Sequence, residues 1–168
     1  MLLCIGIAVG ADGKIFVADG TNIRQIDENG VITTLVGHQR HRATWHPMPC
    51  GGSNGGGGSM PIDEVQLNWP TELAISPLDG SLHIIDDSVI LKVTTDGRVQ
   101  VVAGRPLHCS PVGGHRNQQS LSNDWATSTT LVQPQSIAFA PNGDLYVAES
   151  DSQRINRVRM VTTNGKVR

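Results

Sequence analysis

The stretch that decides the fold runs from Trp69 to Gly104 and reads WPTELAISPLDGSLHIIDDSVILKVTTDGRVQVVAG. Short apolar runs alternate in it with two Asp-Gly dipeptides, at residues 79–80 and 96–97. Such dipeptides tolerate the positive φ that a tight hairpin turn requires. The stretch therefore predicts four short antiparallel strands, read as LAI, LHIID, ILKV and VQVVAG.

The same order of elements occurs in two further copies, at residues 5–37 and 133–168. Each copy repeats the Asx-Gly turns, but the third copy stops before a complete fourth strand. Four antiparallel strands per repeat are typical of a β-propeller blade, and three blades do not close a ring. We therefore predict an all-β chain that holds about three four-stranded blades of a larger propeller, as an open fragment.

The repeats divide the chain into blades and spacers, which together form one partial propeller domain. The predicted segments are blade A (1–37), a Gly-rich inter-blade insert (38–68), blade B (69–104), an inter-blade loop (105–132) and a truncated blade C (133–168). The insert contains CGGSNGGGGSM, a predicted flexible excursion that is compatible with a natural insertion or an engineered linker. Long loops on a rigid scaffold often carry recognition, so we expect both spacers to face a partner.

Composition narrows the classes of function. A net charge of −2 with scattered basic residues disfavours binding to nucleic acid or to an acidic membrane surface. No apolar run approaches the ~18 residues that cross a bilayer. The opening MLLCIGIAVGADGK lacks a basic segment before its apolar run, and we interpret it as a strand and not as a signal peptide.

Three acids stand at the end of the second strand of each copy: Asp19, Asp86 and Glu149. They could bind a metal or act as acid and base if they converged. Because they recur at one position in every blade, we expect them to lie on a circle and not to meet. We interpret them as structural blade acids that accept hydrogen bonds from turn N–H groups or from Arg24, Lys92 and Arg157.

No catalytic residue, metal site or cofactor is predicted. The innermost strands, IGIAV, LAI and IAF, carry no ionisable side chain, and Glu72 alone stands at an entrance, near the position of Gln135 and Ser136. One acid cannot supply the oxygens that a hard cation requires. The spacing of His38, His41 and His46 is compatible with a transition metal, but we interpret them as solvated loop residues, and His83 as a packing position.

The arrangement V-A-D/E, then I-x-R/K-[IV], then N-G or D-G resembles NHL repeats. Within that class, residues 65–109 and 154–167 resemble the NHL propeller of the teneurins. The resemblance implies a six-bladed propeller in the extracellular part of a single-pass type II membrane receptor, whose EGF-like modules and membrane span lie outside this chain. It also implies a dimeric parent protein with roles in cell adhesion, signalling and neuron development, which contacts other teneurins and latrophilin-like adhesion receptors.

The oxidising environment implied by that resemblance bears on the cysteines. Cys50 and Cys109, in the frames HPMPC and RPLHC, could bridge neighbouring loops or could each pair with a cysteine outside this chain. Cys4 lies within or just before a strand and is expected to be a buried free thiol.

Two other functions remain as alternatives to a non-enzymatic interaction scaffold. One is a fragment of an NHL-fold lyase or lactonase, and the other is an RNA-binding NHL propeller. The one basic-leaning stretch has no interleaved aromatic residue for base stacking, so we interpret it as a solvated blade edge; it comprises Arg154, Arg157, Arg159, Lys166 and Arg168. With blade faces exposed, residues 1–168 alone are expected to aggregate or associate.

Overall fold

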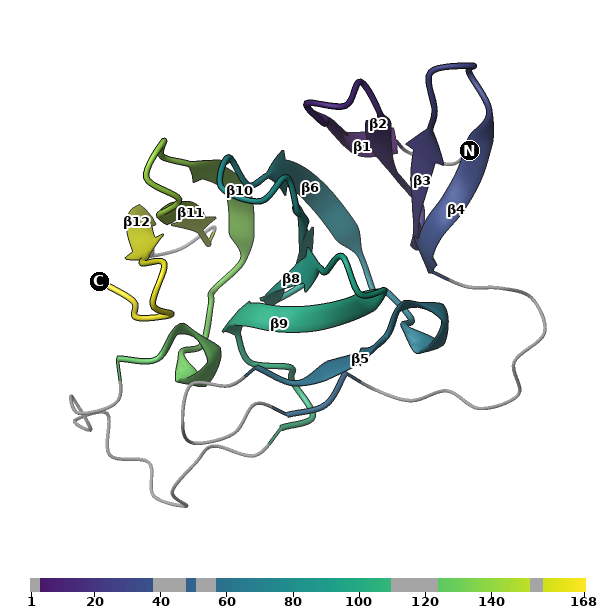
Figure 1. Cartoon of the computed structure of the whole chain (residues 1–168). Helices are drawn as coiled ribbons and strands as arrows, with labels where there is room; N and C mark the ends of the chain where they lie inside the picture. The colour runs from purple at the N-terminus through teal and green to yellow at the C-terminus, as the bar shows by residue number, and fades with distance from the viewer. Residues whose placement is uncertain (1–3, 38–47, 51–56, 110–123, 152–155) are drawn as a thin grey trace.

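The computed structural model describes residues 4–37, 48–50, 57–109, 124–151 and 156–168, and these residues form three antiparallel sheets, which we call blades A, B and C (Figure 1). Blade A comprises β1 (Cys4–Val9), β2 (Ile15–Asp19), β3 (Asn22–Ile26) and β4 (Ile32–Gly37). Blade B comprises β5 (Ser59–Pro61), β6 (Pro70–Ile75), β7 (Leu82–Asp86), β8 (Val89–Val93) and β9 (Arg98–Gly104). Blade C comprises β10 (Pro134–Phe139), β11 (Leu145–Ser150) and β12 (Asn156–Val161), and two 3-10 helices, η1 (Ile62–Glu64) and η2 (Ala126–Ser128), lie in the spacers.

Tight hairpins build each blade, so that strands adjacent in the chain are adjacent in the sheet. The order is β1-β2-β3-β4 in blade A and β10-β11-β12 in blade C, while β6 to β9 follow one another in blade B. The glycine of each predicted Asx-Gly turn has a positive φ, as at Gly80 (67°) and Gly143 (87°). The turn chemistry of the sequence therefore fixes where each strand ends.

The innermost strands place the three blades next to one another. Strand β6 contacts β1 on one side and β10 on the other. The approach between β1 and β6 is close: a Cβ atom on Gly6 would lie 2.7 Å from the carbonyl oxygen of Thr71. A side chain at Gly6 would therefore separate blade A from blade B.

Two apolar cores fill the spaces between the blades. Because successive side chains of a strand point to opposite faces of the sheet, Ile84 faces blade A and Ile85 faces blade C. Ala18 and Ile23 of blade A pack in the first core, and Ile137 and Val147 of blade C pack in the second. Blade B is thus covered on both faces, and every residue of β7 is buried.

The spacers contribute more structure than the sequence indicated. Residues 59–61 of the predicted insert form β5, a fifth strand of blade B that pairs with β9. Met60 on this strand is buried in the core between blades A and B. In blade C the chain turns back after β12, and Val167 forms an antiparallel bridge to Val161.

Candidate functional site

Asp86 ends β7 in a buried position and holds the backbone that leads into β6. Its Oδ1 accepts hydrogen bonds from the N–H groups of Trp69 (2.7 Å) and Asn68 (2.9 Å), and its Oδ2 lies 3.1 Å from the same Asn68 nitrogen. Burial raises the pKa of Asp86 above its ordinary value, while these two N–H groups oppose the rise. The carboxylate therefore holds the segment that enters blade B, although its burial is itself unfavourable for the charged form.

Glu149 takes the same position in blade C but has charged partners. Its Oε2 accepts a hydrogen bond from the N–H of Val132 (2.7 Å), just before β10, and from Nη2 of Arg157 (2.9 Å). Nε of Arg159 lies 2.8 Å from the other carboxylate oxygen in an ion pair. The Glu149 side chain is fully buried, and both arginines come from β12. One carboxylate thus joins the incoming segment to the third strand of the blade.

Asp19 is the third blade acid, and its Oδ2 accepts a hydrogen bond from Nε of Arg24 at 3.0 Å. Arg24 also donates to the hydroxyl of Thr34 on β4. The segment that would correspond to residues 68–69 of blade B lies outside the described residues. Each acid belongs to a different sheet, opposite the first residue of that blade's innermost strand, and the acids are not brought together.

One expected partner is wrong, because Lys92 does not reach Asp86. The strand register places Lys92 opposite His83 and places Asp86 opposite Val89. Side chains at positions 83 and 86 lie on opposite faces of β7, so Lys92 points to the face away from Asp86. Its ammonium lies 2.6 Å from Asp79 instead.

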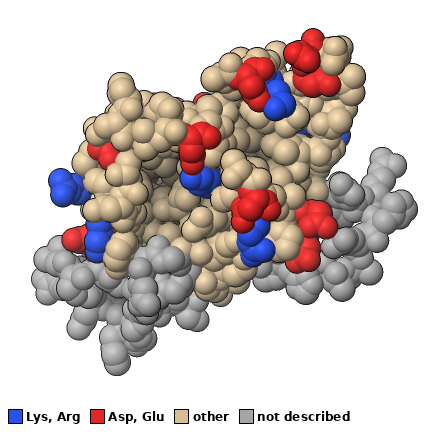
Figure 2. All heavy atoms as spheres, viewed as in Figure 1, with Lys and Arg blue, Asp and Glu red and all other residues tan. Residues whose placement is uncertain are grey.

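The interpretation of the basic stretch as a solvated edge fits Arg157, which is exposed, whereas Arg159 and Lys166 are partly buried. Arg157 and Arg159 form ion pairs with Glu149, and the Lys166 ammonium lies 3.6 Å from the ring centre of Trp125. Arg154 lies outside the described residues, and Arg168 is exposed. On the face shown in Figure 2, acidic and basic side chains lie near one another and form no broad field of one sign.

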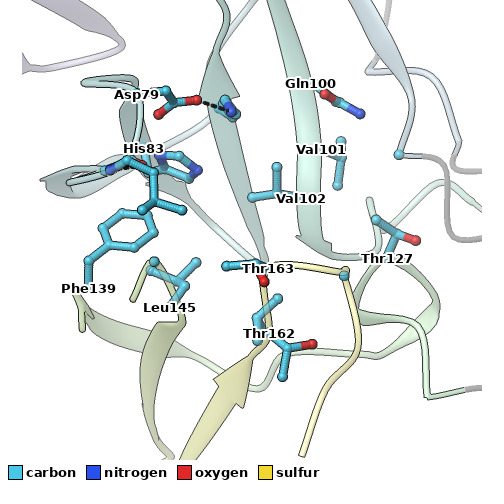
Figure 3. Close-up of a pocket in the computed structure, with 17 residues that line it drawn as sticks. Asp79, His83, Gln100, Val101, Val102, Thr127, Phe139, Leu145, Thr162 and Thr163 are labelled. Atoms are coloured by element: carbon cyan, nitrogen blue, oxygen red, sulfur yellow. Dashed lines mark hydrogen bonds and ion pairs between the residues drawn. The ribbon is translucent and has the colours of Figure 1, made fainter. Parts of the chain in front are cut away.

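A cleft of about 260 Å³ opens between blades B and C, and Figure 3 shows the side chains around it. His83 lines it from β7 with 5% of its surface exposed, and its ring meets the Phe139 ring edge-on at 4.8 Å. Burial lowers the pKa of His83 to about 4, so the imidazole is neutral at physiological pH. Burial acts to raise the pKa of Asp79, but hydrogen bonds from Lys92, Ser81 and Ser76 hold it well below its ordinary value.

The chemistry available in this cleft is limited. The imidazole of His83 lies 3.3 Å from the carbonyl oxygen of Ser81 and is buried by its neighbours, while Asp79 forms an ion pair with Lys92.

Glu72, the acid expected at the entrance, lies half-buried on β6, and burial raises its pKa. Gln135 and Ser136 are exposed at the corresponding place in blade C. The described residues thus present no second carboxylate that acts with Glu72.

The structure joins Cys50 to Cys109 in a disulfide, which ties the insert to the inter-blade loop. His108 lies beside it, with its Nε2 3.0 Å from the carbonyl oxygen of Met48. Ligand atoms of His108 and the two cysteines lie within 4.8 Å of one another, but sulfurs in a disulfide offer no thiolate to a metal. His38, His41 and His46 lie outside the described residues, as does the side chain of Cys4.

A second cleft, of about 350 Å³, adjoins the disulfide, and we call it the spacer cleft. Its lining comes from the insert, from the β7–β8 turn and from the inter-blade loop: Met48, Gln66, Asn68, Asp86, Asp87, Ser88, Val89, Pro106, Leu107 and His108. Leu107 is 80% exposed at this cleft, and Trp69, next to Asn68 in the chain, is also largely exposed. Nothing in the repeat pattern singled out Leu107 or Trp69, because both lie outside the repeated strand positions.

Comparison with known proteins places this fold in a family. The family model described as the teneurin NHL domain matches residues 2–168. The chain belongs to the teneurin NHL domain family. It is 52% identical over 162 residues to Teneurin-m of Drosophila melanogaster and 39% identical over 168 residues to Teneurin-3 of Mus musculus. Each match covers 96% of this chain and 6% of the relative's length. The resemblance to teneurins is therefore confirmed.

Solved propellers confirm the fold class. A gluconolactonase from Xanthomonas campestris superposes with a TM-score of 0.59 at 12% identity, over 99% of this chain and 46% of its own. An inactive variant of virginiamycin B lyase from Staphylococcus aureus gives a TM-score of 0.53 at 19% identity, over 99% of this chain and 40% of its own. The teneurin NHL segment described here is thus an open, partial β-propeller.

Proposed function

We propose that this chain is a non-enzymatic interaction module in the extracellular part of a teneurin-like transmembrane receptor. Membership of the teneurin NHL family supports the proposal. In the described part of the chain, no helix is long and apolar enough to span a bilayer. The receptor would act in cell–cell recognition, signalling and neuronal development, through contacts with other teneurins and with latrophilin-like adhesion receptors.

The observation that carries the proposal is the spacer cleft. Two segments far apart in the chain meet there, and the disulfide between Cys50 and Cys109 joins them across a separation of 59 residues. Asp86, the last residue of the buried strand β7, lines the cleft and binds the N–H groups of Asn68 and Trp69. Two large apolar side chains, Leu107 and Trp69, are exposed beside this cleft on segments outside the repeated strands, and binding residues often lie on such loops of a rigid scaffold.

The contacts of the ionisable side chains support a role in binding a partner and not a role in catalysis. The blade acids are engaged by backbone N–H groups or arginines, and His83 is buried and neutral. A lyase or lactonase would need acidic or imidazole groups that converge on an accessible substrate. Hydrolysis of simple lactones by residues 1–168, dependent on added Ca²⁺ or Zn²⁺, would overturn the non-enzymatic part of the proposal.

A cell-aggregation assay tests the contact. Cells expressing the full-length receptor with Leu107→Asp should aggregate with each other, or with cells bearing a latrophilin-like receptor, much less than wild-type cells. Val31→Asp, at an exposed residue in the last turn of blade A, is the matched control and should aggregate normally. Normal aggregation of the Leu107→Asp cells at equal surface expression would exclude the spacer cleft as the contact.

A further inference from the structure

The Cys50–Cys109 disulfide joins the two spacers, and each cysteine has a contact near it in the chain that does not depend on the S–S bond. Met48, close before Cys50 in the sequence, is buried in the core between blades A and B. The N–H of Cys109 donates a hydrogen bond to the carbonyl oxygen of Pro106 at 2.9 Å. Both sulfurs would therefore stay close to the spacer cleft if the S–S bond were broken.

His108 is the third group at the disulfide. One of its ring nitrogens and the two cysteine sulfurs lie within 4.8 Å of one another. In a tetrahedral zinc centre, Zn–S bonds of about 2.3 Å and Zn–N bonds of about 2.0 Å separate the ligand atoms by roughly 3.5–3.8 Å. Shifts on the order of 1 Å would therefore bring the imidazole and two separated sulfurs to one ion.

A hydrogen bond already orients the His108 ring in the way that a metal ligand requires. Its Nε2 lies 3.0 Å from the carbonyl oxygen of Met48. Because a carbonyl oxygen only accepts, we assign the proton to Nε2, and Nδ1 then has a free lone pair. Histidines that bind metals commonly donate their other N–H to a carbonyl or carboxylate, which fixes the orientation of the ring. Nδ1 is therefore the nitrogen of His108 that is available to a metal.

We propose that reduction of the disulfide creates a zinc site, in which the thiolates of Cys50 and Cys109 and the imidazole of His108 bind one Zn²⁺ ion. A dithiol reductant breaks the S–S bond: its two thiols become a disulfide, and each cysteine gains one electron and one proton. Zn²⁺ then displaces the two thiol protons, and water takes the fourth position. Thiolate and imidazole ligands favour Zn²⁺ over Mg²⁺ and Ca²⁺. This inference does not depend on the proposed adhesion function.

The exposure of the three residues permits both steps. Cys50 is exposed, whereas Cys109 is 6% exposed, so the reductant would attack the sulfur of Cys50 and release that of Cys109. His108 is exposed beside them, which leaves a path for the ion. The disulfide and the zinc site are thus alternative states of the same two cysteines, and each state joins the insert to the inter-blade loop.

Zinc binding by residues 1–168 tests the proposal, with the ion itself as the probe. The chain is reduced with dithiothreitol, which is then removed without oxygen, and native mass spectrometry should find one Zn²⁺ per chain. At the same zinc concentration, the chain with its disulfide intact should bind none. That form has the same histidines and the same Cys4, so it controls for ions bound elsewhere. Co²⁺ in place of Zn²⁺ should give the absorption band of a cobalt–thiolate bond.

Three variants, each reduced in the same way, assign the ligands. Cys109→Ser should abolish binding, and His108→Ala should weaken it by at least about tenfold in competition with a chromogenic chelator. Cys4→Ser, the matched replacement of the remaining cysteine, should bind zinc as tightly as the wild type. Circular dichroism should show the same strand content in the reduced and disulfide forms, since the cores between the blades contain neither sulfur of the disulfide.

Four outcomes would overturn the proposal. Equal zinc binding with the disulfide intact would assign the ion to another part of the chain, as would full affinity in His108→Ala or loss of binding in Cys4→Ser. A reduced chain that keeps its strands and binds no Zn²⁺ would show that the folded blades do not bring the three ligands together. Loss of strand content on reduction would show that the folded chain requires the disulfide, so that the reduced site does not form.

Discussion

At the scale of single residues, Glu149 shows how one carboxylate can support a blade. It is fully buried and is held by two arginines and by the N–H of Val132. Glu149→Gln keeps the shape but leaves two cations beside a neutral amide, and should lower the free energy of unfolding by about 2–3 kcal/mol. Urea denaturation measures the change. Asp12→Asn, at an exposed pair with Lys14, should have no measurable effect, and an equally small effect of Glu149→Gln would contradict the structural role.

His83 makes a second prediction at the residue scale, on the dependence of stability on pH. Its folded pKa of about 4 lies below the unfolded value of 6.5, so the unfolded state binds the proton more readily. The contribution of His83 is complete above pH 6.5 and is lost as the pH falls toward 4, by on the order of 3 kcal/mol. Phe16 holds the position of His83 in blade A, so His83→Phe is a conservative replacement. The variant should not show this loss of stability at low pH.

Urea denaturation of the wild type and of His83→Phe at several values between pH 4 and pH 7 measures the effect. The difference in stability between the two proteins should grow in favour of the variant as the pH falls. Parallel curves would show that folding does not lower the pKa of His83.

At the scale of elements, the disulfide restrains two spacers that have few strands of their own. It closes a loop across a separation of 59 residues, which corresponds to a stabilisation of about 4 kcal/mol in the chain-entropy treatment. Replacing both Cys50 and Cys109 with serine should lower the free energy of unfolding by roughly 2–4 kcal/mol. The variant should also become sensitive to protease within the spacers while the blades stay resistant. Unchanged stability would mean that the blades alone hold the spacers.

At the scale of the whole molecule, the middle blade should be the most stable part. Within the described residues, blade B packs against a neighbouring blade on both faces, whereas blades A and C each pack against blade B on one face. In a stacked array, each repeat gains stability from its nearest neighbours. Native-state hydrogen exchange followed by mass spectrometry should show slower exchange in β7 and β8 than in β2, β3, β11 and β12. Uniform protection would indicate a single cooperative unit.

The sequence by itself determined the hairpins, the repeat and the family. Asx-Gly dipeptides such as Asp79-Gly80 set the turns because few other residues tolerate their backbone angles, and the spacing of the apolar runs then specified strands. The recurrence of Asp19, Asp86 and Glu149 also predicted that these acids would not converge, and the structure places them in separate sheets. Turn dipeptides and repeats depend on residues close in the chain or at regular spacing, so they can be recognised from the sequence alone.

Only the tertiary structure decided how distant segments meet. The sequence left the pairing of Cys50 and Cys109 open, and it did not show that residues 59–61 add a strand to blade B. Lys92 faces away from Asp86 because strand register, and not nearness in sequence, selects the face of a side chain. Met60 lies in the predicted Gly-rich insert, but the structure buries it in the core between blades A and B. Its burial arises from the pairing of β5 with β9 and the packing between blades, because burial depends on which segments lie opposite and not on the residue alone.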